Sequence, residues 1–326
     1  MNRRHFVSLA GPAFVSLHLG TIIRTNTSRR NVQSQHKHRI DSLATDGPYF
    51  DAKKALEAGL TGAIIDMSMY PRTFDNAVHT LAEWNTRFRD PNSNIHKVTR
   101  FDHFAEAAQQ KKFAVVLACQ DGAILDSSTA SVYDYNIQNL GLFYDLGLRV
   151  LQLTHNERNA VGDSFRERED SGLSRLGETV VKAMNDLGML IDLSHCSRRT
   201  TLQAVQLSTK PCAITHAGCK ALLPTARNKT DEEIRAVAEK GGYFGVFNAS
   251  SWLTSRPTAS ISDIVDHIDH AIKLGGIDHV GFGSDRPVLQ DDQPMEKMLE
   301  GARYYYERNK GLPGAETQPQ HVLIQE

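Results

Sequence analysis

Short apolar runs alternate along the chain with longer stretches of helical periodicity. Eight apolar runs begin near residues 39, 63, 113, 150, 189, 212, 243 and 279. Between them, stretches such as 179–187 and 231–240 repeat apolar positions every three or four residues, as amphipathic helices do. Alternation of this kind predicts parallel strands joined by crossover helices. Because eight strands can close on themselves, the pattern predicts an α/β fold, a (β/α)8 TIM barrel.

The stretch 231–240 carries the clearest helix boundaries. Thr230 can cap the first turn, and the acidic residues Asp231, Glu232 and Glu233 suit the positive end of the helix dipole. Gly241 then follows the last periodic position and is expected to end the helix.

The two ends of the chain depart from the barrel pattern. Arg3 and Arg4 precede an apolar run over 7–19, which is the layout of a twin-arginine export signal. We expect residues 1–38 to be this signal and a polar linker, and residues 39–326 to form a single barrel domain with an incomplete closure after Asp285. The location would be periplasmic or secreted. A surface helix with a basic start is the alternative for the N-terminus.

Composition narrows the range of partners. The net charge of −1 gives no positive field for a nucleic-acid backbone, and no other apolar stretch reaches the roughly 20 residues of a membrane span. The four cysteines lack the paired spacing of a zinc ribbon, so we expect buried thiols. The expected partner is a small-molecule substrate such as a dipeptide. A homodimer is the assembly considered, although the sequence does not fix the oligomeric state.

Polar residues of metal-binding type follow several predicted strands. His155 and Asn156 follow the fourth strand, His195 the fifth, His216 the sixth and Asp285 the eighth. Catalytic groups of a TIM barrel collect at these C-terminal strand ends, and imidazole with carboxylate is a ligand mixture that zinc accepts. A single histidine after a strand is more often a hydrogen-bonded loop residue. Because several converge, we predict a metal or acid–base site, with Asn156 as a candidate substrate-binding neighbour.

An ordered series of short motifs resembles the membrane (renal-type) dipeptidase family of metal-dependent hydrolases. The resemblance runs from about Ile40 to Asp285 and implies an amidohydrolase-like barrel. The motifs that carry it are Leu153-Thr154-His155-Asn156, Asp192-Leu193-Ser194-His195, Ile214-Thr215-His216, Arg227-Asn228-Lys229-Thr230-Asp231, Gly241-Gly242 and Gly283-Ser284-Asp285.

The resemblance also implies roles for individual residues. His195 and His216 fall on the family's two bridging metal ligands, and Asp285 falls on its acid–base carboxylate. His155 falls on the histidine that contacts substrate and steadies the oxyanion, and Arg227 on the arginine that holds the substrate carboxylate.

Two departures from the family pattern bear on the number of metals. The first strand has Asp41 without the family's histidine, and Gln120 stands where a bridging glutamate is expected. A glutamine carries no charge and offers one oxygen, so it is a poor bridge between two cations, although both Asp41 and Gln120 remain candidate ligands. We prefer one zinc ion on His195 and His216, completed by Asp285 or Asp41 and water. A second zinc, and a metal-free pocket, stay open.

Three functions follow. The leading hypothesis is a metallo-exopeptidase that hydrolyses a small dipeptide through a metal-activated water. The second is an amidohydrolase acting on another small amide, lactone or ester. The third is a small-molecule binding protein that has lost hydrolysis. Ligation by a thiolate of Cys196 or Cys219 is a further option, which we disfavour because such cysteines usually pack behind metal-binding histidines.

Overall fold

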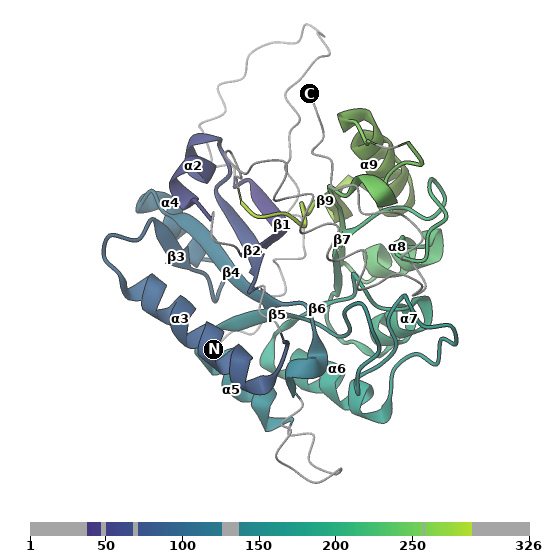
Figure 1. Cartoon of the computed structure of the whole chain (residues 1–326), viewed down its shortest axis with the longest axis horizontal. Coiled ribbons are helices and arrows are strands. Elements are labelled where there is room, and N and C mark those ends of the chain that lie inside the picture. Colours follow the sequence, from purple (N-terminus) through teal and green to yellow (C-terminus); the bar gives the residue numbers. More distant parts are fainter. Residues whose placement is uncertain (1–37, 47–49, 68–70, 126–136, 257, 289–326) are drawn as a thin grey trace, which may run out of the picture.

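The computed structural model describes residues 38–46, 50–67, 71–125, 137–256 and 258–288. Its strands form one nine-stranded parallel sheet in the order β1-β2-β4-β5-β6-β7-β8-β9, with β3 beside β4 (Figure 1). All eight predicted strands are confirmed, whereas β3 was not predicted. The strands are β1 (Ile40–Thr45), β2 (Gly62–Asp66), β3 (Ile95–Lys97), β4 (Phe113–Cys119), β5 (Leu148–Gln152), β6 (Leu190–Asp192), β7 (Ala213–Ala217), β8 (Tyr243–Val246) and β9 (Val280–Phe282).

The sheet closes where β1 meets the segment after β9. The Asp285 N–H donates to the Leu43 carbonyl at 2.9 Å, and the Thr45 N–H donates to the Arg286 carbonyl at 2.9 Å. These two bonds continue the parallel pairing between the first and last strands of the sheet. The predicted TIM barrel is therefore nearly closed, and Asp285 lies on the closing seam.

Helices surround the sheet and follow it in chain order (Figure 1). The predicted helices over 179–187 and 231–240 correspond to α6 and α8, and Gly241 ends α8 with a φ of +76°. The helices are α2 (Ala52–Glu57), α3 (Phe74–Arg89), α4 (His103–Gln109), α5 (Gln138–Leu146), α6 (Arg175–Leu187), α7 (Arg198–Leu207), α8 (Asp231–Glu239) and α9 (Ile261–Gly275).

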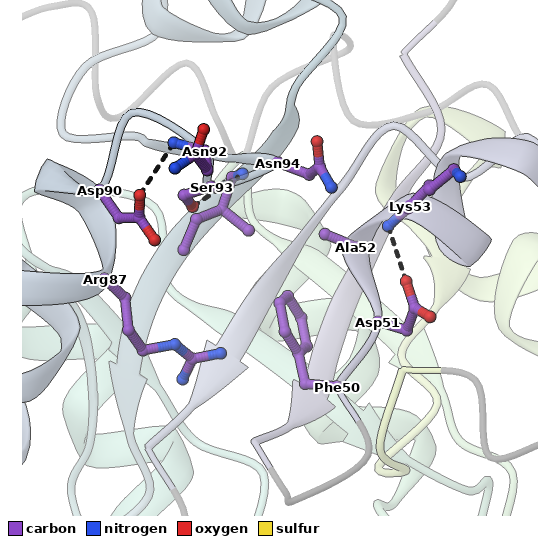
Figure 2. A pocket seen from close by; sticks show the side chains of 10 residues that line it. Phe50, Asp51, Ala52, Lys53, Arg87, Asp90, Asn92, Ser93 and Asn94 are labelled. Atoms are coloured by element: carbon purple, nitrogen blue, oxygen red, sulfur yellow. Dashed lines mark hydrogen bonds between the residues drawn. The ribbon is translucent and has the colours of Figure 1, made fainter.

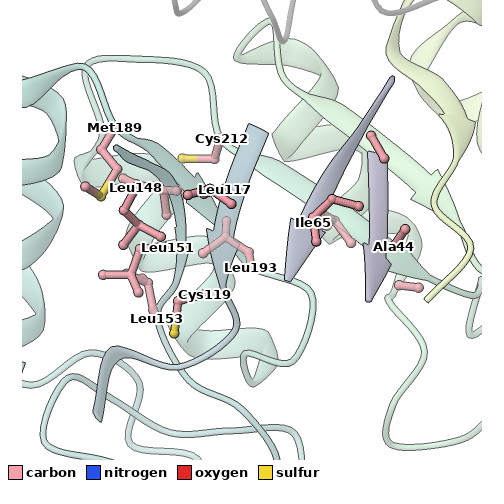
Figure 3. Close-up of a cluster of buried hydrophobic side chains, with 14 of the residues drawn as sticks. Ala44, Ile65, Leu117, Cys119, Leu148, Leu151, Leu153, Met189, Leu193 and Cys212 are labelled. Atoms are coloured by element: carbon pink, nitrogen blue, oxygen red, sulfur yellow. The ribbon is translucent and has the colours of Figure 1, made fainter. Parts of the chain in front are cut away.

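Successive strand residues divide the apolar core into two layers, because strand side chains alternate between faces. One cluster joins the outward faces of the strands to the helices; it includes Ile65, Leu117 and Leu151 (Figure 3). The neighbouring positions, such as Ile64, Val116 and Val150, form a second cluster. The first layer fixes the helices against the strands, and the second fills the barrel interior below the strand ends.

Some terminal predictions lie outside the described residues. The twin-arginine signal and most of the linker fall on 1–37, and the C-terminal tail falls on 289–326. Among the residues that the structure places, no helix combines the length and apolarity needed to cross a bilayer.

The predicted cap of α8 allows a stability test. The Thr230 hydroxyl accepts the Glu233 N–H, and the Glu233 carboxylate accepts the Thr230 N–H at 2.9 Å, so the two residues form a capping box. We expect Thr230→Ala to lower the free energy of unfolding in urea by about 1 kcal/mol. Thr179→Ala is the control, because Thr179 lies inside α6 and caps nothing. Equal losses in the two variants would contradict a specific capping effect.

Candidate active site

The strand-end histidines and Asp285 meet at one end of the barrel. His155, His195 and Asp285 follow β5, β6 and β9, and His216 lies near the end of β7. The rings of His155 and His195 stack with centroids 4.4 Å apart, and the Nε2 atoms of His195 and His216 are 3.0 Å apart. The Asp285 Oδ1 atom is 4.0 Å from His216 Nε2. Strand ends far apart in the chain thus supply one cluster.

Hydrogen bonds orient the two facing imidazoles. His195 Nδ1 lies 3.0 Å from Asn156 Oδ1, and because an amide oxygen only accepts, Nδ1 carries the proton. His216 Nδ1 lies 2.8 Å from the Thr215 hydroxyl, which itself donates to Asp192 at 2.7 Å. His216 therefore also donates from Nδ1. Both Nε2 lone pairs then face each other, an arrangement that repels unless a cation lies between them.

Asp192 fixes the ends of β6 and β7 behind the histidines. Its buried carboxylate accepts the hydroxyl protons of Ser194 at 2.5 Å and Thr215 at 2.7 Å, and also the backbone N–H groups of both residues. These contacts agree with a supporting carboxylate that positions the loops of His195 and His216.

Burial sets the charge state of the cluster. It is the largest cause that lowers the pKa of His155, His195 and His216, and the positive charge of Arg227 lowers all three further. The imidazoles are therefore neutral at pH 7 and keep a lone pair. Burial raises the pKa of Asp285 to about 6, while Arg227 acts in the opposite direction. Asp285 is thus largely ionised at pH 7.

Asp285 has a strained backbone as well as a perturbed pKa. Its φ is +55°, which is uncommon for a residue other than glycine. Its N–H is held by the Leu43 carbonyl of β1, and its side chain is 23% exposed. The closing seam of the barrel therefore holds this carboxylate beside His216, with one side open to solvent.

Arg227 lies beneath the histidines. It is 1% exposed, and its terminal nitrogens donate to the Ser194 carbonyl at 2.6 Å and the His216 carbonyl at 2.8 Å. The guanidinium also lies 5.2 Å from the centroid of the Phe247 ring. Arg227 thus ties together the backbones that carry His195 and His216. Its predicted contact with a substrate carboxylate stays a prediction.

Asp41 and Gln120 are also buried, Asp41 near the start of β1 and Gln120 directly after β4. Asp41 accepts the N–H groups of Leu43 at 3.1 Å and Ser284 at 2.8 Å, and burial raises its pKa to about 7. The Gln120 N–H donates to Asp66 at 3.1 Å, but its side-chain oxygen has no hydrogen-bond partner within the described part of the chain. Asp41 is thus engaged with backbone, whereas the Gln120 amide oxygen is a buried acceptor that a ligand could use.

The cluster fits a metal ion only in part. Two ligands about 2.0–2.1 Å from a tetrahedral zinc lie about 3.3 Å apart, close to the 3.0 Å between the two Nε2 atoms. The facing lone pairs of His195 and His216 therefore suit one cation. Over the ranges that the structure describes, however, no three His, Cys, Asp or Glu side chains are grouped so that they could hold a metal. Within those ranges, a third protein ligand is not in place beside the two imidazoles.

The cysteines do not supply that third ligand. All four are buried and free of disulfides, as predicted. Burial raises the pKa of Cys196 to about 11 and that of Cys219 to about 12, so both are protonated thiols at pH 7. Neither cysteine belongs to a group of three His, Cys, Asp or Glu side chains that could hold a metal in the described ranges, which argues against the thiolate alternative.

A buried ion pair at this end of the barrel was not predicted from the sequence. Asp66, the last residue of β2, lies 3.5 Å from Arg72, and the two side chains are 3% and 6% exposed. Asp66 is the polar residue at the end of an apolar strand. The same pattern identified the histidines, and it could have identified Asp66 as well. Arg72 belongs to no motif, so only the fold places it here.

A separate pocket lies at the other end of the sheet. Its volume is about 330 Å³, and it is lined by Phe50 and Lys53 near the start of α2, Arg87 and Asp90 at the end of α3, and Ile95 at the start of β3 (Figure 2). The histidines lie at the C-terminal ends of strands, whereas this pocket is lined by Ile95, the first residue of β3. The pocket is therefore distinct from the histidine cluster.

Comparisons with characterised sequences point to dipeptidases. The chain is 33% identical over 150 residues to dipeptidase tcpJ of Claviceps purpurea, which covers 45% of this chain and 35% of that protein. It is 34% identical over 150 residues to dipeptidase aclJ of Aspergillus oryzae, covering 45% and 36% of the two chains. The matched segment thus spans about a third of the length of these relatives.

Solved structures share the fold over most of the chain. An amidohydrolase from Pseudomonas aeruginosa is 27% identical, with a TM-score of 0.69 over 80% of this chain and 77% of that one. The probable dipeptidase PvdM from the same organism is 22% identical, with a TM-score of 0.67 over 76% and 83%. The family description "Membrane dipeptidase (Peptidase family M19)" matches residues 50–293. The chain therefore belongs to the membrane dipeptidase family.

Proposed function

We propose that this protein is a metal-dependent hydrolase of small dipeptides. One observation carries the proposal: the unprotonated Nε2 atoms of His195 and His216 face each other 3.0 Å apart at the end of the barrel, beside Asp285. Membership of the membrane dipeptidase family supports it and implies a metal cofactor. We propose zinc as the metal and a single ion, held by His195 and His216 with Asp285 as the nearest carboxylate.

Several residues of the chain would each have a separate role in hydrolysis. A bound zinc ion would supply Lewis acidity at the scissile carbonyl. Asp285, largely ionised at pH 7, would accept a proton from the attacking water and pass it to the leaving amine. His155, neutral and stacked on His195, would donate a hydrogen bond to the oxyanion. Asn156 keeps the His195 lone pair directed into the site.

The proposal extends to the rest of the chain. We propose one barrel domain over 39–326 and an exported protein, the latter on the paired arginines Arg3 and Arg4 ahead of an apolar run. An N-terminal fusion to a reporter that folds only after export would test the location.

The function is tested by metal-dependent turnover. We expect protein stripped with a chelator to be inactive on alanyl-alanine and to regain activity when one equivalent of zinc is added, because the facing Nε2 atoms of His195 and His216 would hold one ion. Liberated alanine is the readout. Small lactones, esters and other amides are assayed in parallel, and activity on those alone would favour the broader amidohydrolase reading.

A binding protein without hydrolysis is the second candidate. Two observations favour it: a third metal-binding side chain is not grouped with the histidines in the placed parts of the chain, and Gln120 provides no carboxylate. Zinc content decides between the candidates. A purified chain that contains no stoichiometric metal, and gains no activity with zinc or manganese, would favour the binding protein.

A further inference from the structure

Lys229 is a buried cation that the proposed reaction does not use. It lies in the loop before α8, two residues after Arg227, and its side chain is 3% exposed. The ammonium donates to the Cys196 carbonyl at 2.7 Å, the Thr201 hydroxyl at 2.9 Å and the Glu233 carboxylate at 3.2 Å. Because an ammonium has three N–H groups, these three acceptors use all of them and fix its position.

Glu233 holds the ammonium from the first turn of α8. One of its carboxylate oxygens binds Lys229, and the other accepts the Thr230 N–H at 2.9 Å and the Thr230 hydroxyl at 2.8 Å. Burial raises the pKa of Glu233, but the charge of Lys229 and the bonds from Thr230 outweigh burial and lower that pKa. Glu233 is therefore ionised at pH 7, and the two residues form a buried ion pair.

The backbone of Lys229 binds the segment that follows His216. Its N–H donates to the Gly218 carbonyl at 2.9 Å. Its side chain holds the carbonyl of Cys196, which directly follows His195. One residue thus makes hydrogen bonds to both of the segments that carry the facing histidines.

Three consecutive carbonyls around His195 are each bound by another part of the chain. The Ser194 carbonyl accepts a hydrogen bond from Arg227 at 2.6 Å, and the His195 carbonyl accepts one from the Phe165 N–H at 2.9 Å. Lys229 supplies the bond to the third carbonyl. Together these contacts fix the backbone that carries the imidazole.

A buried ion pair adds little to stability by itself. The cost of removing two charges from water is similar to what their attraction returns, and uncharged replacements of such pairs are often neutral or stabilising. The contacts of Lys229 instead reach a backbone carbonyl beside a proposed metal ligand. The observed contacts therefore favour a role in placing that backbone over a role in stability.

We propose that Lys229 is a positioning residue: its ammonium, held by Glu233, fixes the segment of His195 against the segment that follows His216. The inference rests on the proposed function, because it concerns the alignment of the two proposed metal ligands. Groups that orient a metal ligand without touching the metal contribute to metal affinity. Lys229 would keep the two rings facing each other before a metal ion binds.

Three variants of the full chain test this role. Lys229→Met with Glu233→Gln removes both charges at once, and glutamine can keep the capping box of α8. The matched control is Arg198→Met with Glu232→Gln, because these residues form an ion pair between α7 and α8 that is 54% and 56% exposed. Val237→Ala removes apolar packing from the buried face of α8 and keeps the ion pair, so it controls for lost stability.

Amide hydrogen exchange and zinc affinity are the two readouts. Exchange is measured by mass spectrometry over residues 193–197 of the metal-free protein, and zinc affinity by competition with a chelator. We expect the Lys229→Met, Glu233→Gln variant to exchange these amides about tenfold or more faster and to bind zinc about tenfold or more weakly. Both controls should stay within about twofold of the wild type in each readout.

Exchange and zinc affinity that stay at wild-type values in the double variant would overturn the role of Lys229. Equal changes in Val237→Ala would overturn it too, because they would trace the effect to lost stability. If the double variant does not fold, Glu233→Gln alone is the milder test and should change both readouts in the same direction; unchanged readouts would again contradict the role. A wild type that binds no zinc would refute the proposed function, and the exchange rates would still decide the role of Lys229.

Discussion

Replacing His195 with alanine is expected to remove the metal and turnover together. Its Nε2 atom faces that of His216 at 3.0 Å, so the variant leaves one imidazole where two now converge. Because the bound cation would be held mainly by these two rings, we expect zinc content to fall below a tenth of an equivalent and kcat/KM to fall on the order of a thousandfold. Elemental analysis and alanine release measure the two quantities.

His103→Ala is the matched control for that experiment. His103 is a partly buried histidine at the start of α4, and its ring contacts the Lys97 carbonyl and the Thr99 N–H away from the cluster. Metal content and turnover should match the wild type, and circular dichroism should show that both variants fold. A His195→Ala protein that kept a full equivalent of zinc would refute the proposed ligand pair. Loss of turnover with metal retained would assign His195 a role other than ligation.

The barrel was predictable because most of its eight predicted strands contain a compact apolar run. Residues such as Val116 and Leu117 alternate between the barrel interior and the helix layer, so both faces of the strand are apolar. β3 was missed because it lacks such an apolar run. It pairs only with the first half of β4, and its sequence of Ile95, His96 and Lys97 has a single apolar residue. A three-residue strand of this composition leaves no pattern in the sequence.

The site residues that directly follow an apolar strand could be predicted from the sequence. The other residues of the site could not. His195, His216 and Asp285 each close an apolar run, and a barrel brings such ends together. Arg72 has no such signal, because it is placed by an ion pair with Asp66, and no sequence pattern links the two residues. The hydrogen bonds of the site could not be predicted either. Nothing in the sequence indicates that Asn156 and Thr215 fix the tautomers of the two facing histidines.

Asp41→Asn should stabilise the metal-free protein at high pH. Burial raises the pKa of Asp41 from 3.8 to about 7, so the folded chain keeps a proton that the unfolded chain releases. The proton-bound group contributes stability below pH 4, and that contribution is lost as the pH rises through 7. Between pH 5 and pH 8 the loss is about 3 kcal/mol for this group. Asparagine remains neutral, so the variant should show a flatter pH dependence of the free energy of unfolding in urea.

Asparagine can also preserve the local structure, since its amide oxygen can accept the same N–H groups of Leu43 and Ser284. Asp278→Asn, at an exposed position, is the control and should leave the pH dependence unchanged. An unaltered slope in Asp41→Asn would show that the carboxyl ionises normally in the fold. Zinc affinity of the same variant then separates two roles for Asp41. A ligand would lose affinity when its charge is removed, whereas a carboxyl that only joins β1 to the segment after β9 would not, because its two backbone contacts survive the change.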